Sequence, residues 1–403
     1  MKLGFFFELQ LPRPWDSESE HRIYKEGIEQ AELADKLGFD YIWAVEHHFL
    51  EEYSHCSAPE IFLTACSQRT KNIRLGHGVV LTSPGYNHPA RVAERLGALD
   101  LVSDGRLDFG SGESSSESEL GGFCQQRSEK REKWREGLEA VCRMMAETPF
   151  QGYEGKHFTM PVRNVVPKPL QKPHPPLWLA ASKPETVNLA AQLGMGSLTI
   201  TFVPPEEIKP LVDGYYDSLS NQCEPIGFAV NPNIFFVAPF MTARTEDRLK
   251  QMLRGAEHFF LHASSHYFGD GEHEPGKTSV WEKFQKNPID LQKAFPHLYG
   301  KPGNQCVGTL QFVRDKLRKF EEAGADQVGL MGQICNYRHE DICEAMELLG
   351  REVLPEFKDR EAKRAREKAA VVAPMIERAM KRKSAPRIPH HDGPTIVKAA
   401  GVY

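Results

Sequence analysis

Short apolar runs alternate along the chain with longer runs in which apolar residues recur every three to four positions. The short runs are typical of strands, and the longer ones are typical of amphipathic helices. The pattern predicts strands at residues 2–8, 40–45, 73–81, 106–111, 177–181, 196–202, 233–240 and 326–331. It predicts helices at residues 21–37, 58–70, 88–103, 128–147, 184–193, 205–219, 245–262, 309–323 and 339–354.

Strands that alternate with helices in this way predict an α/β fold, a (β/α)8 TIM barrel with insertions. A doubly wound open sheet is the alternative. In a barrel the loops that follow the strands form the active end, so we expect residues 111–127 and 182–183 at the site. The long segment 263–308 lies between the predicted seventh helix and eighth strand. We expect it at the opposite end as a surface excursion, unless it folds back as a lid or partner surface.

Composition excludes several classes of protein. The chain has 403 residues, of which 40% are hydrophobic, and it contains no apolar run long enough to span a membrane. The first residues read as a strand without a small-residue cleavage site, so we expect a cytoplasmic location. Eight scattered cysteines lack the spacing of a metal site and are interpreted as reduced thiols.

Charge is distributed unevenly. The net charge is −5, which gives no reason to expect nucleic acid, but residues 358–403 hold 12 Lys and Arg against 5 Asp and Glu. We therefore divide the chain into a barrel, residues 1–357, and a basic C-terminal helix and extended tail, residues 358–403. The tail is either a solvated helix with a loose end or an arm across a more acidic neighbouring subunit. The charge contrast favours the arm, and with it a homodimer or homotetramer.

The end of the second predicted strand carries the sequence Glu46-His47-His48. Side chains alternate along a strand, so only one of the two histidines leads into the barrel mouth without a bend. A histidine at that place is suited to proton transfer near neutral pH. From these residues alone, a structural histidine is the better interpretation. A metal site is a third interpretation, but adjacent histidines on a strand diverge.

Glycines and a helix start mark further places where a ligand could approach. Gly78 and Gly112 lie at the ends of the third and fourth predicted strands, where glycine leaves room for a planar or anionic group. The sequence after Gly112 lacks the third glycine of a dinucleotide-binding fingerprint. After the fifth strand, Ser182 is expected to cap a helix with Pro184 in its first turn. The amides of that helix start would suit a phosphate, although an ordinary capped helix has the same sequence.

Several segments, taken together and in order, resemble the bacterial luciferase-like family of flavin-dependent monooxygenases. The resemblance extends from about residue 1 to residue 357. Its segments are Gly38-Phe39-Asp40-Tyr41-Ile42-Trp43, Glu46-His47-His48-Phe49, Ile73-Arg74-Leu75-Gly76, His88-Pro89-Ala90-Arg91-Val92-Ala93-Glu94, Ser103-Asp104-Gly105-Arg106-Leu107-Asp108-Phe109-Gly110, Tyr153-Glu154-Gly155-Lys156-His157-Phe158, Pro167-Lys168-Pro169-Leu170 and Val307-Gly308-Thr309.

The resemblance implies a two-component enzyme. A separate flavin reductase would supply reduced flavin mononucleotide (FMN), which reacts with O₂ to a C4a-(hydro)peroxide that oxidises a small organic substrate. The resemblance places His47 at the flavin as the catalytic residue, and we place Glu46 in the cofactor site beside it. Phe6, Tyr86 and Phe202 are candidate pocket residues, which suggests an apolar or aromatic substrate.

The same resemblance assigns further cofactor residues. It implies a cis peptide bond at Gly78-Val79 beneath the isoalloxazine, and phosphate binding at Ala181 and Ser182. Gly112 is the other cofactor-binding residue we expect.

The chain departs from luciferase at Glu113, where luciferase has a phosphate-binding arginine. Lys183 or the helix start would then neutralise the phosphate. Alternatives are a deazaflavin-dependent oxidoreductase of the same barrel family, a metal-dependent barrel hydrolase using Glu46, His47 and His48, and a non-catalytic flavin-binding subunit.

Overall fold

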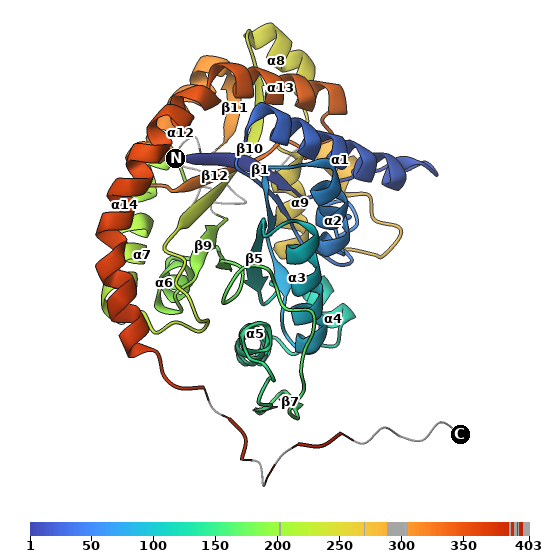
Figure 1. The fold of residues 1–403 in the computed structure, drawn as a ribbon. Helices are drawn as coiled ribbons and strands as arrows, with labels where there is room; N and C mark the ends of the chain where they lie inside the picture. Colours follow the sequence, from blue (N-terminus) through green and yellow to red (C-terminus); the bar gives the residue numbers. More distant parts are fainter. Residues whose placement is uncertain are drawn as a thin grey trace.

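Parallel strands close into a barrel that helices surround (Figure 1). The computed structural model describes residues 1–200, 203–269, 271–287, 303, 305–386, 388–390, 393 and 395–397. In barrel order the strands are β1 (Lys2–Phe7), β2 (Tyr41–Ala44), β3 (Arg74–His77), β5 (Leu107–Gly112), β8 (Leu177–Ala181), β9 (Gly196–Thr199), β10 (Ile234–Ala243) and β12 (Gln327–Met331). Because β12 pairs with both β10 and β1, the ring closes. The (β/α)8 barrel is confirmed, and the open sheet is excluded.

The outer layer consists of helices that return the chain from one strand to the next. They are α1 (Ser19–Leu37), α2 (Pro59–Arg69), α3 (Pro89–Val102), α5 (Lys130–Ala146), α6 (Pro184–Gln192), α7 (Lys209–Gln222), α12 (Leu310–Glu322) and α13 (His339–Glu352). Smaller elements are α4 (Glu117–Gly122), the hairpin β6 (Tyr153–Glu154) and β7 (Thr159–Met160), and a 3₁₀ turn at Pro205–Glu207. Among the described residues, no helix is both long enough and apolar enough to cross a membrane.

Aromatic side chains fill the barrel interior. The rings of Trp43 and Trp178 meet edge to face with centroids 5.3 Å apart, and Trp43 lies equally close to Phe235. The glycines opposite them are required by this packing, because a Cβ at Gly76 would lie 2.1 Å from the Trp43 ring and one at Gly196 would lie 2.4 Å from Trp178. The lower barrel is therefore a packed core, and a ligand has room only at its ends.

Three predicted elements have different bounds. The third strand, predicted over 73–81, is interrupted between β3 and the short β4 (Val80–Leu81). The helix predicted over 245–262 is two helices, α8 (Glu246–Leu253) and α9 (Phe259–Phe268). The strand predicted over 196–202 ends at Thr199, and residues 201–202 lie outside the described part.

The long insertion lies at the active end, so the expected placement at the opposite end was wrong. Strand β11 (Cys306–Thr309) pairs in parallel with the last residues of β10, and α12 begins directly after it. The seventh barrel helix is therefore α12. The described residues between β10 and β11, which are 244–269, 271–287, 303 and 305 and include α8, α9 and α10 (Val280–Lys286), belong to the loop after the seventh strand. That loop belongs to the carboxyl ends of the strands, where barrel enzymes place their active sites.

The basic tail begins as a long helix, α14 (Leu354–Arg382), which runs along the outside of the barrel beside α7 (Figure 1). Arg360 pairs with Glu321 at 2.7 Å and Lys368 with Asp326 at 2.6 Å. These basic residues are matched by acidic groups of their own barrel, so the charge contrast no longer argues for an arm on a neighbouring subunit. The boundary expected at residue 357 falls inside α14, and the division into two units stays a prediction.

Candidate active site

His47 stands between two buried carboxylates at the barrel mouth. It follows the end of β2 by three residues, and about 20% of its side chain is exposed. Its Nδ1 lies 3.0 Å from Glu119 Oε1, and its Nε2 lies 3.9 Å from Glu8 Oε2. Glu8 is 3% exposed and Glu119 is 1% exposed. A histidine flanked in this way is equipped to hold and exchange a proton.

Sequence reasoning missed both carboxylates. Glu8 follows β1, the strand that pairs with β2, so the barrel brings it beside His47. Glu119 lies on α4, in the loop 111–127 that we expected at the site. Its carboxylate also accepts hydrogen bonds from the His48 amide at 3.1 Å and the Ser114 hydroxyl at 2.8 Å. The position of Glu8 directly after a strand was the one signal available for it.

The environment separates the proton affinities of the two carboxylates. Burial raises the pKa of Glu8 to about 7, although the neighbouring His47 partly offsets the effect. Burial also raises the pKa of Glu119, but the charge of His47 and the hydrogen bonds outweigh it and hold this pKa below its ordinary value. Burial lowers the pKa of His47, yet Glu119 and Glu8 outweigh it, and the net shift is upward. Near neutral pH, Glu119 is ionised while Glu8 titrates.

Glu46 and His48 form a separate network, so the two histidines diverge as predicted. Glu46 accepts hydrogen bonds from the Leu81 amide at 2.9 Å and from Asn87 Nδ2 at 3.0 Å, and its Oε1 lies 3.0 Å from His48 Nε2. These contacts tie the His47 segment to the loop after β4. Within the described residues no group of three or more His, Cys, Asp or Glu could hold a metal ion. Glu46 as a direct cofactor contact stays a prediction.

Gly78, Val79 and Gly112, which we call the platform, lie together at the same end of the barrel. The Gly78-Val79 peptide bond is cis, as predicted. A Cβ at Gly112 would lie 2.5 Å from Val79 Cγ2, and one at Gly78 would lie 2.7 Å from the Phe6 ring. Side chains are therefore excluded at both glycines. Phe6 is only 1% exposed, so it supports the platform from the core instead of lining an open pocket.

The start of α6 is open, as a phosphate site would need to be. Ala181, the last residue of β8, is buried, whereas Ser182 is exposed. Pro184 occupies the first helical position as predicted. The expected Ser182 cap is wrong: Lys183 is the capping residue, and its side chain makes no capping hydrogen bond. The first amides of the helix therefore have no side-chain partner, but phosphate binding at Ala181 and Ser182 stays a prediction.

An apolar roof from the insertion covers His47. The ring of Phe268, on α9, lies 5.9 Å from the His47 ring and 5.2 Å from the ring of Tyr53. Tyr53 stacks in turn on Phe260 of the same helix at 5.3 Å. The carboxylate of Glu52, fully buried, accepts hydrogen bonds from the Val280 and Trp281 amides at the start of α10. The insertion is thus fastened to the segment that carries His47.

A second aromatic group stands at the rim of the site. The ring of Phe123 lies 4.8 Å from His48, 4.8 Å from Tyr86 and 5.3 Å from Phe49. Tyr86 was a predicted pocket residue, and the structure places it in this group. Phe49 is 53% exposed, which is unusual for a phenylalanine. Phe202, the third predicted pocket residue, lies outside the described residues.

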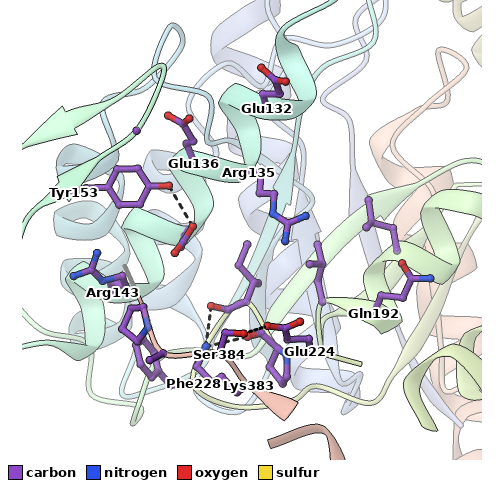
Figure 2. Close-up of a pocket in the computed structure, with 18 of the residues that line it drawn as sticks. Glu132, Arg135, Glu136, Arg143, Tyr153, Gln192, Glu224, Phe228, Lys383 and Ser384 are labelled. Atoms are coloured by element: carbon purple, nitrogen blue, oxygen red, sulfur yellow. Dashed lines mark hydrogen bonds between the residues drawn. The ribbon is translucent and has the colours of Figure 1, made fainter. Parts of the chain in front are cut away.

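A separate cavity of about 1070 Å³ lies between α5, the β6–β7 hairpin and the end of the tail helix. Figure 2 shows its strongly charged lining, which includes Glu132, Arg135, Glu224 and Lys383. None of the predicted site residues is among those that line it. The chemistry of the site therefore has to be argued from His47 and its neighbours, not from this cavity.

Comparison with known proteins agrees with this geometry. Residues 1–327 match the family model described as Luciferase-like monooxygenase. The oxygenase component of the flavin-dependent trigonelline monooxygenase of Acinetobacter baylyi is 25% identical over 334 residues, 81% of this chain and 88% of that protein. The crystal structure of monooxygenase RslO1 from Streptomyces bottropensis has a TM-score of 0.70 at 26% identity, and the match covers 89% of this chain and 100% of that one.

The fold is also shared with a protein of different chemistry. An F420-dependent secondary alcohol dehydrogenase has a TM-score of 0.65 at 18% identity, covering 88% of this chain and 98% of that one. This likeness shows the fold alone. The family match spans most of the chain, including the strands and loops that hold His47, Glu8 and Glu119. The chain belongs to the luciferase-like monooxygenase family.

Proposed function

We propose that the chain is the oxygenase component of a two-component flavin-dependent monooxygenase. It would receive reduced FMN from a separate flavin reductase and use O₂ to oxidise a small organic substrate. The observation that carries the proposal is His47, held between Glu8 and Glu119 beside the Gly78-Val79-Gly112 platform at the active end. The flavin-dependent relative from Acinetobacter, named as an oxygenase component, supports both the cofactor class and the reductase.

The residues present fit a flavin nucleotide. Glycine is required at Gly78 and Gly112 by the protein's own packing, because a Cβ there would meet Phe6 and Val79, and this packing fixes the surface that we propose to lie beneath the planar ring. The start of α6, next to Ala181 and Ser182, has no side-chain cap, so its positive dipole end is open to a phosphate. Glu113, which replaces the arginine of luciferase, is paired with Arg131 at 2.7 Å, so its charge is already neutralised. When bound, reduced FMN supplies the electrons with which O₂ is activated.

The chain's own residues would bind the nucleotide, shield the site from water and move protons. The platform and the start of α6 hold the two ends of the nucleotide. Phe268 and Tyr53 exclude water above His47, which protects reactive groups from hydrolysis and strengthens charge interactions. His47 holds or delivers a proton at Nε2, because Glu119 engages its Nδ1.

An apolar or aromatic substrate is the class that we propose, because Phe49, Tyr86 and Phe123 form an aromatic wall at the rim. The cytoplasmic location is proposed from the sequence alone. A homodimer or homotetramer stays a prediction that the charge of the tail no longer supports.

The test combines the chain with a general flavin reductase, NADH and a panel of small apolar and aromatic compounds under ¹⁸O₂. We expect one compound to gain a single ¹⁸O atom, and the His47→Ala variant to give no product. Submicromolar to micromolar binding of reduced FMN, measured anaerobically by fluorescence, is expected in both proteins. Absence of measurable flavin binding would contradict the proposal, whatever compounds are tried.

A deazaflavin-dependent oxidoreductase is the second candidate. The observation that keeps it is Glu113, which stands where luciferase has the arginine that binds the FMN phosphate. The fold shared with the F420-dependent dehydrogenase is compatible with this function but does not favour it. Such an enzyme would transfer hydride without O₂. Parallel titration with reduced FMN and reduced F420 separates the two, and binding of F420 alone would replace the first proposal by the second.

A further inference from the structure

Glu8 is a buried carboxylate with an oxygen that lacks a partner. It is 3% exposed, and its Oε2 has no hydrogen bond among the described residues. The Tyr53 hydroxyl is a hydrogen-bond partner of the same carboxyl group. Burying an ionised carboxylate with so few partners costs several kcal/mol, so a site of this kind favours either a bound proton or a cation. The charged group that faces it is His47, whose Nε2 lies 3.9 Å from Oε2. This separation is within ion-pair distance but too long for a direct hydrogen bond.

Glu119, by contrast, has hydrogen-bond partners at both oxygens. It accepts from the His48 amide and the Ser114 hydroxyl, and it lies 3.0 Å from His47 Nδ1. An ionised carboxylate only accepts hydrogen bonds, so Nδ1 carries a hydrogen in this contact. The remaining nitrogen, Nε2, is then the one that gains and loses a proton. It points to Glu8 and the mouth.

We propose that Glu8 and His47 share one exchangeable proton between Oε2 and Nε2, and that Glu119 is the positioning residue that fixes the ring. The pair exists as protonated Glu8 with neutral His47, or as ionised Glu8 with the His47 cation. The proton leaves Oε2 and reaches Nε2 by exchange with water, because 3.9 Å is too long for direct transfer. No electrons are exchanged, and the pair is neutral overall in both forms. Its use in oxygenation rests on the proposed function, whereas the shared proton itself does not.

The surroundings support this assignment. The titratable groups that face the pair are Glu119 from α4, Glu46 and Cys56 on the segment that follows β2, and Tyr53. Burial raises the pKa of the Cys56 thiol well above its ordinary value, so the thiol remains neutral. Burial raises the pKa of the Tyr53 hydroxyl well above its ordinary value, so it remains neutral. Phe268 closes the remaining side without a charge. Near neutral pH, Glu119 is therefore ionised, and one proton is bound either to Glu8 or to His47.

The experiment follows the protonation of both residues by NMR in the full-length protein without flavin. The chain is labelled with ¹⁵N in histidine rings and ¹³C in glutamate carboxyls, and the His47 signals are assigned by their loss in His47→Gln. In the wild-type protein we expect Nδ1 to stay protonated, Nε2 to titrate above the ordinary 6.5, and Glu8 to titrate near 7. The two curves should each show two steps, because coupled sites titrate as a pair.

Two variants and one control separate the roles. Glu8→Gln should reduce the His47 curve to one step and lower its midpoint by about one pH unit. Glu119→Gln should lower the midpoint of the His47 titration further and allow the His47 ring to adopt both tautomers. Glu26→Gln is the matched control, since Glu26 is a half-buried carboxyl on α1 with a raised pKa that faces His339 instead of the barrel mouth. It should leave the His47 curve unchanged.

An unchanged His47 curve in Glu8→Gln would overturn the proposal. If that variant does not fold, the wild-type carboxyl titration decides alone, and a Glu8 midpoint near 4.5 would overturn the shared proton. In the reductase-coupled assay, Glu8→Gln should lose one limb of the pH dependence of kcat with little change in KM. If the wild-type chain binds no flavin but the NMR result holds, the proposed function fails and the shared proton stands.

Discussion

His77 provides a direct test of how burial sets the protonation of this chain. It is the last residue of β3 and is 1% exposed, and neither ring nitrogen has a hydrogen-bond partner among the described residues. Burial, assisted by the charge of Arg95, lowers its pKa from 6.5 to about 3. The folded protein therefore keeps His77 neutral under conditions in which the unfolded chain takes up a proton.

The sign and size of the effect follow from linkage. As pH falls through 6.5, unfolded His77 becomes charged while folded His77 does not, so protonation stabilises the unfolded state. Between pH 8 and pH 5 the contribution of His77 to the free energy of unfolding falls by about 2 kcal/mol. Below pH 3 the loss levels off at about 5 kcal/mol, from the difference of the two pKa values.

Urea unfolding of the wild-type protein and His77→Leu at pH 8 and pH 5 measures this contribution. The other titrating groups are present in both proteins, so the difference between the two pH-dependent losses isolates His77. We expect the wild type to lose about 2 kcal/mol more than His77→Leu on going from pH 8 to pH 5. His21→Leu, which removes a side chain 65% exposed, is the control and should follow the wild type. Parallel losses in wild type and His77→Leu would refute the reasoning.

Three further outcomes are expected. His47→Ala should lower product formation roughly 100-fold or more and leave reduced-FMN binding within about threefold, and unchanged product yield would remove its assigned role. Gly112→Ala places a Cβ 2.5 Å from Val79 Cγ2, so it should weaken flavin binding about tenfold. Adding Val79→Ala to this variant should restore part of the affinity. Equal flavin affinity in the wild type and both variants would exclude a role of the platform in binding. Arg74→Met removes the ion-pair partner that lies 2.6 Å from Asp108, a carboxylate only 2% exposed. Urea unfolding should show that the free energy of unfolding falls by about 3–5 kcal/mol. A fall of less than about 1 kcal/mol would contradict this prediction.

The barrel was predictable because each strand and helix has its own periodic signal. Where the insertion lies was not predictable, because a helix within a loop has the same amphipathic period as a helix of the barrel wall. The segment 245–262 was therefore read as the seventh barrel helix, although α12 fills that place. Only the pairing of β11 with the end of β10, between residues more than 60 positions apart, distinguishes the two.

The same limit applies to the site. His47 could be found because the resemblance pointed to it. Glu119 was hidden among the acidic residues of the loop 111–127, and only contacts across 72 positions of sequence select it. The glycines at 78 and 112 were expected to leave room for a ligand, which stays a prediction. The groups that the structure packs against them are Phe6 and Val79, and these depend on three-dimensional packing that the sequence does not reveal.

The hydrogen bonds that join Glu52 to the start of α10 have a consequence for how a substrate reaches the site. Lifting the roof would remove two hydrogen bonds of the Glu52 carboxylate, those from the Val280 and Trp281 amides, and leave it the Arg13 amide at 2.9 Å. Two hydrogen bonds to a charged group are worth about 3–5 kcal/mol. Fewer than about one molecule in a hundred would then have its roof raised at any moment. We therefore expect substrate and product to pass through a side entrance beside the exposed ring of Phe49, while the hydrogen bonds between Glu52 and the start of α10 stay formed throughout turnover. The Val280 and Trp281 amides should accordingly exchange with solvent deuterium as slowly in turnover mixtures as in the resting protein.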